Sequence, residues 1–285
     1  MPTLSIIIPC RNEAQSLRAL LPEIKQNQPD AEIILVNDGS TDDSGLVAEQ
    51  AGVTVINRPY SMGNGAAIKT GARHASGDIL LFMDADGQHQ PQDIARLLTE
   101  MQQGYDMVVG ARDSKSQASI GRWFANGFYN KLSSWMVGHQ IDDLTSGFRA
   151  VIATKFKEFL HLLPNKFSYP STITMAFFRA GYAVSYMPIF APPRIGKSHI
   201  RPIRDGLRFL LIIFKIGTLY SPLKLFIPLS MSFFSLGLIY YGFTFFTQGR
   251  FTNMGALLFI SAILIFLIGL VSEQITQILY SHKDS

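Results

Sequence analysis

Residues 79–91 read ILLFMDADGQHQP, in which an apolar run stops at one acid and a second acid follows two positions later. The run Ile79–Met83 predicts a buried strand. Asp84 and Asp86 would point the same way if the strand continued through them, because side chains alternate along a strand. Two adjacent carboxylates repel each other unless a cation lies between them. With the amide oxygen of Gln88, they predict a divalent cation site beside substrate phosphates, with a polar helix-capping loop as the alternative.

Short apolar runs alternate with helical patterns through the first half of the chain. We expect strands at Leu4–Ile8, Glu32–Val36, Val53–Ile56, Ile79–Met83 and Met107–Gly110, with helices at Ala14–Gln26, Gly63–Ala75 and Pro91–Gln103. This alternation predicts an α/β domain whose mostly parallel sheet is covered on both faces. Ligands of such sheets bind beyond the carboxyl ends of the strands, where the polar segments IPCRNE, VNDGS, FMDADGQ and VVGAR fall. In VNDGS, Asp38 could bond a ribose or a base edge, or form an ordinary turn.

Two long apolar runs lie near the end of the sequence, and neither Leu225–Gly249 nor Phe251–Ser272 contains a charged residue. A helix needs about 20 apolar residues to cross a bilayer. We therefore expect two transmembrane helices, at about 223–247 and 252–278. Basic residues between 201 and 224 outnumber acids, whereas the loop between the spans offers one Arg. The positive-inside rule then predicts a multi-pass protein of the cytoplasmic membrane, with residues 1–220 in the cytoplasm.

Two further segments combine apolar and basic or polar stripes at helical spacing, at about 117–138 and 201–220. Both are expected to lie in the membrane interface, with ordinary core-packing helices as the alternative. The predicted organisation is thus an α/β domain at 1–200, a juxtamembrane helix at 201–220, and the two spans within 221–285. The net charge of +4 fits attraction to a membrane surface, and no nucleic-acid motif is present.

Basic residues fall in polar segments near the predicted sheet edge. Arginine suits the forked recognition of phosphate, so the set predicts a phosphate-binding cluster, although each could be a surface charge: Arg112, Arg122, Arg149, Arg194 and Lys197. The segment GNGAAI at 63–68 begins like a dinucleotide fingerprint. Its last position is Ile and it does not follow the first strand, so NAD binding is rejected.

Seven segments, in order, resemble the family 2 glycosyltransferases with the GT-A fold: IIIPCRNE, VNDGSTDDS, GNGAAIKTG, DADGQH, GAR, DLTSGFRA and RIGKS. They are most similar to the dolichyl-phosphate mannose synthase group and its bacterial polyprenyl-phosphate relatives. The resemblance covers roughly residues 3–200, and the terminal spans match membrane-anchored members. It implies a GT-A, Rossmann-like catalytic domain with interfacial amphipathic helices and a C-terminal two-helix transmembrane hairpin.

The resemblance also implies roles for individual residues. The nucleotide would be held by Pro9, Arg11, Glu13, Val36 and Asp38, and Mg²⁺ or Mn²⁺ by Asp84, Asp86 and Gln88, with Ala85 close to the donor. The lipid phosphate would be approached by Arg112, Arg122 and Asn126, and the acceptor side shaped by Asp143, Ser146 and Arg149. The donor phosphates would be covered by Arg194, Lys197 and Ser198, with Arg112 beside them. Catalysis itself would depend on Asp84, Asp86 and Arg122.

Two departures from the family pattern affect these assignments. Arg11 stands where a Tyr is frequent, and the segment at Arg194 is one residue shorter than usual. Either Lys197 or His199 could therefore take the role of the donor-phosphate Lys.

The implied reaction moves a sugar from a UDP- or GDP-linked donor to polyprenyl phosphate at the cytoplasmic membrane face, with metal dependence and inversion. The QxxRW motif of processive synthases is absent, which favours a single transfer. A phosphate acceptor is already an anion at neutral pH, so no catalytic base is needed and the histidines are interpreted as bystanders. The alternatives are another lipid acceptor and a catalytically inactive membrane adaptor. A homo-oligomer is compatible with the sequence.

Overall fold

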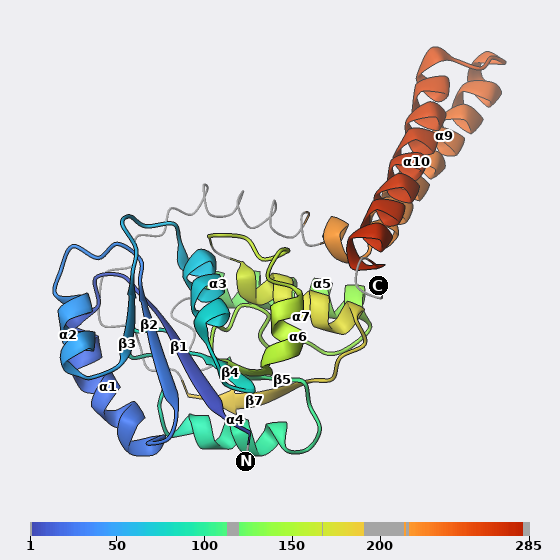
Figure 1. The fold of residues 1–285 in the computed structure, drawn as a ribbon. Helices are drawn as coiled ribbons and strands as arrows, with labels where there is room; N and C mark the ends of the chain where they lie inside the picture. Colours follow the sequence, from blue (N-terminus) through green and yellow to red (C-terminus); the bar gives the residue numbers. More distant parts are fainter. Residues whose placement is uncertain (1, 113–119, 167, 191–213, 215–216, 282–285) are drawn as a thin grey trace. The chain divides into compact units, whose positions relative to one another are not determined.

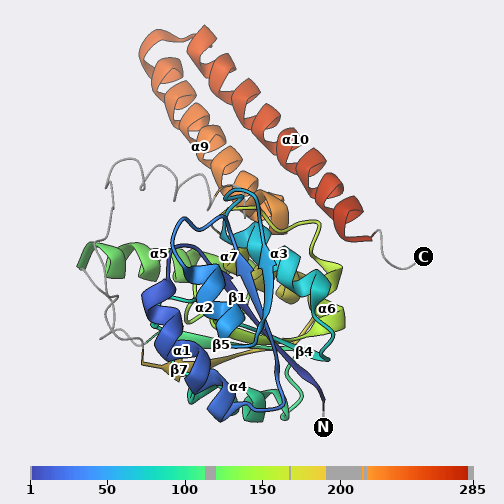
Figure 2. The same ribbon diagram turned by 60° about the vertical axis from the view of Figure 1, so that its left-hand side comes forward.

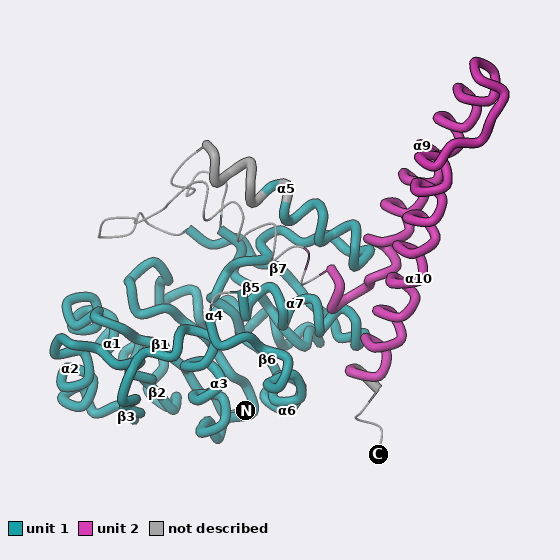
Figure 3. Tube along the Cα trace, turned by 90° about the horizontal axis from the view of Figure 1, so that it is seen from above, with its two compact units in different colours: residues 1–200 teal, residues 201–285 magenta. Residues whose placement is uncertain are grey.

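The computed structural model describes residues 2–112, 120–166, 168–190, 214 and 217–281. The chain forms two compact units, Met1–Ile200 and Arg201–Ser285, which are coloured separately in Figure 3. The boundary lies at the place where the sequence predicts the end of the catalytic domain.

The first unit is built on a seven-stranded sheet with the order β3-β2-β1-β4-β6-β5-β7. The strands are β1 Leu4–Cys10, β2 Glu32–Asn37, β3 Thr54–Asn57, β4 Ile79–Phe82, β5 Met107–Arg112, β6 Arg149–Ile152 and β7 Val184–Ile189. Only β6 runs antiparallel to its neighbours, β4 and β5. The expected mostly parallel sheet is therefore confirmed, and its five expected strands are all present.

Helices cover both faces of this sheet (Figures 1 and 2). The helices of the first unit are α1 Ala14–Asn27, α2 Ser44–Gln50, α3 Asn64–His74, α4 Asp93–Met101, α5 Ile120–Val137, α6 Ala153–Glu158 and α7 Tyr169–Arg179, of which α5 contacts α7. Because side chains alternate along a strand, neighbouring residues of β1 contact helices on opposite faces of the sheet. Ile6 and Ile8 pack with α1 and α4, whereas Ile7 faces α3. Phe82 on that second face packs on Phe156 of α6, with ring centroids 4.6 Å apart.

The segment that begins like a dinucleotide fingerprint forms the N-terminus of α3. The free N–H groups of this terminus are bonded by another loop of the protein. The N–H groups of Gly65 and Ala66 donate to the carbonyls of Lys166 and Asn165, at 3.3 and 2.8 Å. A Cβ added at Gly65 would lie 2.1 Å from the carbonyl oxygen of Pro164. This glycine therefore admits a neighbouring loop rather than a pyrophosphate, in agreement with the rejection of NAD binding.

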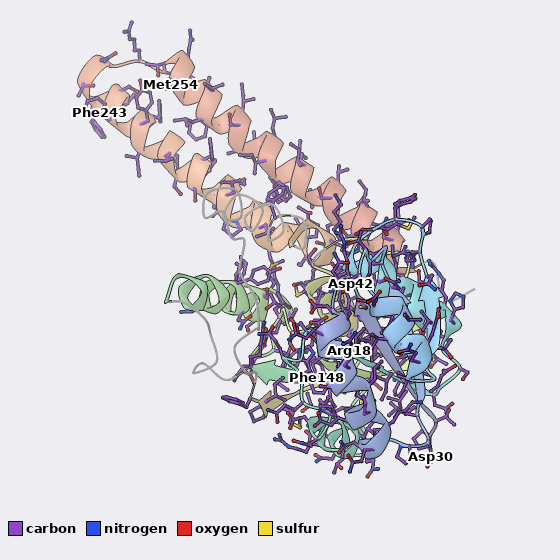
Figure 4. All side chains as sticks on the ribbon, turned by 90° about the vertical axis from the view of Figure 1, so that its left-hand side faces the viewer. Arg18, Asp30, Asp42, Phe148, Phe243 and Met254 are labelled. Atoms are coloured by element: carbon purple, nitrogen blue, oxygen red, sulfur yellow. The ribbon has the colours of Figure 1, made fainter. Side chains whose placement is uncertain are left out.

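The second unit contains the hairpin of α9, Pro222–Gln248, and α10, Asn253–Ser281. Both helices are long and apolar enough to cross a membrane. Most of their large apolar side chains are exposed, including Phe243 and Met254, which are labelled in Figure 4. The two helices approach closely at Gly269, where an added Cβ would meet Phe226. The expected juxtamembrane helix at 201–220 falls almost entirely outside the described residues.

Candidate active site

The two acids of the DADGQH segment lie in a turn beyond the end of β4, because the strand stops at Phe82. The condition for strand alternation to align Asp84 with Asp86, a strand that continues through both acids, is therefore not met. Short-range hydrogen bonds shape this turn: the N–H of Asp84 donates to His89 Nδ1 at 3.1 Å, and the N–H of Gln88 donates to Asp86 Oδ1 at 3.2 Å. Both carboxylates remain partly exposed.

His89, which was interpreted as a bystander in catalysis, is a structural part of this turn. Its ring is buried and stacks on Phe148, with centroids 4.9 Å apart. Burial lowers the pKa of His89 to about 4, so Nδ1 is free to accept the N–H of Asp84 at neutral pH. In the sequence, the only sign of this role is that His89 ends the DADGQH segment, five residues after Asp84.

The carboxylate of Asp84 rests against Gly147, which precedes β6. A Cβ added at Gly147 would lie 3.1 Å from Asp84 Oδ2 and 3.5 Å from Oδ1. Such a contact is tight enough to displace one of the two groups. Because Gly147 has no side chain, it leaves room for the carboxylate of Asp84.

Arg112, at the end of β5, forms a two-pronged ion pair with Asp143. Arg112 Nε donates to Asp143 Oδ2 at 2.7 Å and Nη2 donates to Oδ1 at 3.0 Å, while Nη2 also contacts Thr145 Oγ1 at 2.6 Å. Although burial opposes the charge, Asp143 raises the pKa of Arg112, with help from Asp84 and Asp86. Burial alone would raise the pKa of Asp143, but the hydrogen bonds and charge of Arg112 outweigh it and lower that pKa.

These interactions place two acids and an ion pair at one edge of the sheet. Asp84, Asp86 and Asp143 all act electrostatically on Arg112. The residues come from three separate parts of the chain, after β4, at the end of β5 and before β6. Among the described residues, no group of three or more His, Cys, Asp or Glu side chains forms a metal-binding cluster.

The residues expected to hold a nucleotide begin at the ends of β1 and β2. Pro9 and Val36 are register partners in these parallel strands, so the expected contacts lie side by side. Arg11 is exposed and Glu13 is partly buried. Glu13 and Asp86 both line a pocket of about 800 Å³, whose wall also includes Asn12, Glu23, His89 and Gln92. Its described lining includes four carboxylates, of Glu13, Glu23, Asp42 and Asp86, so this part of the wall suits cations and hydrogen-bond donors.

Asp38 organises the loop between β3 and α3. Its carboxylate accepts hydrogen bonds from Arg58 Nη1 at 3.0 Å, Ser61 Oγ at 2.7 Å, and the N–H groups of Met62 and Gly63, both at 2.9 Å. Burial alone would raise the pKa of Asp38, but these donors together lower it. With four donors on its two oxygens, the carboxylate holds this loop in place, and its contact with a nucleotide stays a prediction.

An Asp38→Asn variant is expected to be less stable by about 3 kcal/mol, because an amide cannot accept all four donors. Since the pKa of Asp38 is lowered in the folded protein, its contribution is present above the ordinary aspartate pKa of about 3.9 and is lost as pH falls through the folded value. The melting temperatures of wild type and variant should therefore differ at pH 7 and converge in acid. Asp43→Asn, at an exposed position whose side chain makes no capping bond, is the matched control. Equal melting of Asp38→Asn and wild type at pH 7 would contradict this role.

Three residues expected on the acceptor side are buried, namely Asp143, which pairs with Arg112, and also Ser146 and Arg149. Ser146 is 1% exposed and Arg149 is 0% exposed, so neither side chain offers an atom to a ligand in this structure. The contact of Arg149 with the acceptor stays a prediction, and in this structure its guanidinium is enclosed by the protein. Arg122 and Asn126 lie on α5, but their side chains are outside the described part, as are Arg194, Lys197 and Ser198 altogether.

Comparison with known proteins adds independent findings. Residues 5–160 match the model of glycosyl transferase family 2, and residues 221–278 match that of the GtrB C-terminal hairpin. The undecaprenyl-phosphate 4-deoxy-4-formamido-L-arabinose transferase of Proteus mirabilis (strain HI4320) is 35% identical over 158 residues, 51% of this chain and 48% of that protein. The protein of the same name from Serratia proteamaculans (strain 568) is 39% identical over the same shares. The chain thus spans about half the length of these curated relatives.

Among solved structures, glucosyl-3-phosphoglycerate synthase from Mycobacterium tuberculosis, in complex with Mn²⁺, UDP-glucose and phosphoglyceric acid, resembles this fold with a TM-score of 0.60. The alignment covers 76% of this chain and 79% of that one at 19% identity, which shows the likeness of fold alone. The family match runs from β1 through the acidic turn, β5 and β6, and so includes the whole cluster around Arg112. Because that match covers more than half of the chain and the sheet has the corresponding fold, the chain belongs to glycosyl transferase family 2.

Proposed function

We propose that this protein transfers one sugar from a nucleotide diphosphate sugar to a polyprenyl phosphate at the cytoplasmic face of a membrane. The observation that carries the proposal is the gathering of Asp84, Asp86 and the Arg112–Asp143 pair at one sheet edge. The relatives named as undecaprenyl-phosphate transferases support the acceptor class. The two apolar helices supply a means of holding the enzyme where such a lipid lies.

The side chains of the acidic turn fit a bound Mg²⁺ or Mn²⁺. Such ions are commonly held by one or two protein carboxylates, with phosphates of the substrate and water completing the shell. Asp84 and Asp86 supply the carboxylates, and Gln88 adds an amide oxygen. The ion, when bound, would offset the charge that develops on the departing nucleoside diphosphate. The absence of a larger carboxylate or histidine cluster in the described residues agrees with a site that the donor itself completes.

Arg112 is suited to hold a phosphate beside that turn. Asp143 fixes its guanidinium through Nε and Nη2, and no hydrogen bond within the described residues uses Nη1. A guanidinium held on one side is pre-organised for an anion on the other. The acceptor phosphate carries negative charge at pH 7, since its second pKa is about 6, and needs no side chain to remove a proton. Its attack on the anomeric carbon from the side opposite the leaving group inverts that centre.

The membrane arrangement follows from charge and hydropathy. Basic residues precede α9, and the loop between α9 and α10 carries Arg250 as its one charge. This asymmetry supports a cytoplasmic catalytic unit and a hairpin that crosses the membrane twice. A catalytic unit on that side would meet the lipid phosphate at the surface.

The test is a transfer assay with the purified full chain in detergent, polyprenyl phosphate, Mn²⁺ or Mg²⁺, and a panel of UDP- and GDP-sugars. Lipid-linked sugar is read by mass spectrometry. One product that disappears with a chelator supports the proposal and identifies the donor. Nucleotide binding without any product would reject polyprenyl phosphate as the acceptor and favour another lipid or an adaptor role.

An Arg122→Ala variant tests the part assigned to α5. We expect transfer to fall by about 10- to 100-fold through a raised KM for the lipid, because a charged hydrogen bond to phosphate contributes about 1.5–3 kcal/mol. Binding of the nucleotide should be unchanged. Lys131→Ala, an exposed cation on the same helix, is the control. Unaltered acceptor kinetics in Arg122→Ala would remove this residue from the acceptor site.

A further inference from the structure

The most unusual group in the first unit is the guanidinium of Arg149, which is fully buried at the start of β6. Its register partners, Phe82 on β4 and Val109 on β5, place it on the face of the sheet that α6 and α7 cover. No carboxylate of the described residues forms an ion pair with it. Burial accordingly lowers its pKa.

A buried charge of this kind is costly. Replacement of a buried ionic group by a well-packed apolar side chain is often neutral or stabilising, so stability alone does not account for an arginine here. Nε of Arg149 and the hydroxyls of Ser146 and Tyr186 also lack partners among the described residues. The guanidinium therefore calls for an explanation other than core packing.

Its hydrogen bonds connect the start of α7 to the segment that borders the acidic turn. Arg149 Nη1 donates to the carbonyl of Pro170 and to Thr174 Oγ1 on α7, both at 3.1 Å, and Nη2 donates to the carbonyl of Ser146. The guanidinium also lies over the ring of Tyr169, 5.9 Å from its centroid. One side chain thus ties the start of α7 to the Ser146–Gly147 backbone.

Tyr169 completes the connection to the site. Its hydroxyl donates to the carbonyl of Gly147 at 3.3 Å, and Gly147 is the residue whose bare Cα borders the carboxylate of Asp84. Phe148, the next residue, points to the opposite face of the sheet and stacks on His89, which accepts the N–H of Asp84. The segment from 146 to 149 therefore reaches Asp84 in two ways. Gly147 borders the Asp84 carboxylate, and Phe148 stacks on His89, which accepts the main-chain N–H of Asp84.

We infer that Arg149 and Tyr169 are positioning residues for Asp84, which hold the Gly147 backbone where the carboxylate can take a divalent cation. This inference rests on the proposed function, because it assigns the cation to that turn. It predicts that a change in either side chain reduces the factor by which the cation increases the affinity for a nucleoside diphosphate. Diphosphate binding without the cation should be unaffected.

Two variants probe the connection at different distances from the core. Tyr169→Phe keeps the ring under the guanidinium and removes only the hydroxyl that reaches Gly147. Arg149→Lys keeps the charge, but a single nitrogen cannot reach both Ser146 and α7. If Arg149→Lys does not fold, the isosteric Tyr169→Phe variant decides. Tyr182→Phe is the matched control, since the hydroxyl of Tyr182 bonds Glu158 and not the Gly147 segment.

The experiment measures the affinity of the full chain in detergent for uridine and guanosine diphosphates, with chelator and with saturating Mn²⁺. For wild type, Mn²⁺ should strengthen binding. In Tyr169→Phe this enhancement should fall by about three- to tenfold, less than the loss of about 10- to 100-fold expected for a direct partner of a ligand. Affinity in chelator and the melting temperature should match those of wild type and Tyr182→Phe.

The outcomes separate the inference from the function on which it rests. Enhancement equal to wild type in a folded Tyr169→Phe protein would overturn the positioning role and leave the proposed transfer intact. The positioning role would also be overturned if the affinity of Tyr169→Phe for the diphosphate fell by the same factor with chelator as with Mn²⁺. Such a result would mean that the substitution disturbs the fold of the site in general. Wild-type protein whose diphosphate binding ignores Mn²⁺ would overturn the metal site and the inference together.

Discussion

An Asp84→Asn variant is expected to transfer sugar at least about a thousandfold more slowly than wild type, because the charge that pairs with the cation is lost. The substitution is nearly isosteric. Its N–H can still donate to His89, and its side chain still fits beside Gly147. The loss should therefore come from chemistry and not from misfolding, and a time course of lipid-linked sugar formation measures it.

The control for this variant is Asp30→Asn, at the exposed turn between α1 and β2, which is labelled in Figure 4. It removes one carboxylate from the same unit and should leave the rate unchanged. Melting temperatures of both variants should stay close to that of wild type. A rate for Asp84→Asn within tenfold of wild type would show that the acidic turn does not carry the reaction.

Periodicity alone predicted much of the architecture. The expected helix Ala14–Gln26 is observed as Ala14–Asn27, and the two apolar helices expected at about 223–247 and 252–278 are observed as Pro222–Gln248 and Asn253–Ser281. These elements are long, and one face or the whole length is apolar, so their pattern dominates local preferences. Their bounds agree within a few residues.

Strand β6 was not predicted, for a physical reason that concerns the site. It has four residues, Arg149–Ile152, and its first side chain is a buried arginine whose partners come from α7. A charged residue in a short run does not indicate a strand. Its antiparallel insertion between β4 and β5 is a long-range event that no local pattern reports.

The acidic turn shows the same limit at finer scale. The residue types Asp84 and Asp86 indicated the chemistry, but their relative placement depends on His89 and Gly147, which lie 5 positions away and on a distant segment. Likewise, the hydrogen bonds by which the Asp38 carboxylate holds the β3–α3 loop could not be read from the sequence, and its contact with a ribose or a base stays a prediction. Sequence reasoning found the polar residues of the site but could not determine which of them bind one another.

The second large effect is expected for Asp143→Asn, which should lower transfer by about 100-fold. The buried carboxylate fixes Arg112 through Nε and Nη2, and an amide offers one acceptor where the guanidinium presents two donors. Arg112 would then turn freely toward Asp84 and Asp86 and compete with the cation for their charge. Loss of a partner from a buried pair also costs stability, about 3 kcal/mol.

Asp142→Asn is the matched control, since Asp142 is adjacent, exposed and bonded to Gln140. Because the pKa of Asp143 is lowered by Arg112, the pair stays intact through the neutral range and is lost only as pH falls through that lowered value. Wild type and Asp142→Asn should thus keep their rates from pH 8 to about pH 5 as far as this pair is concerned, whereas Asp143→Asn should be slow throughout. If Asp143→Asn matched Asp142→Asn in rate, Arg112 would not need its partner, and its part in holding a phosphate would have to rest on its charge alone.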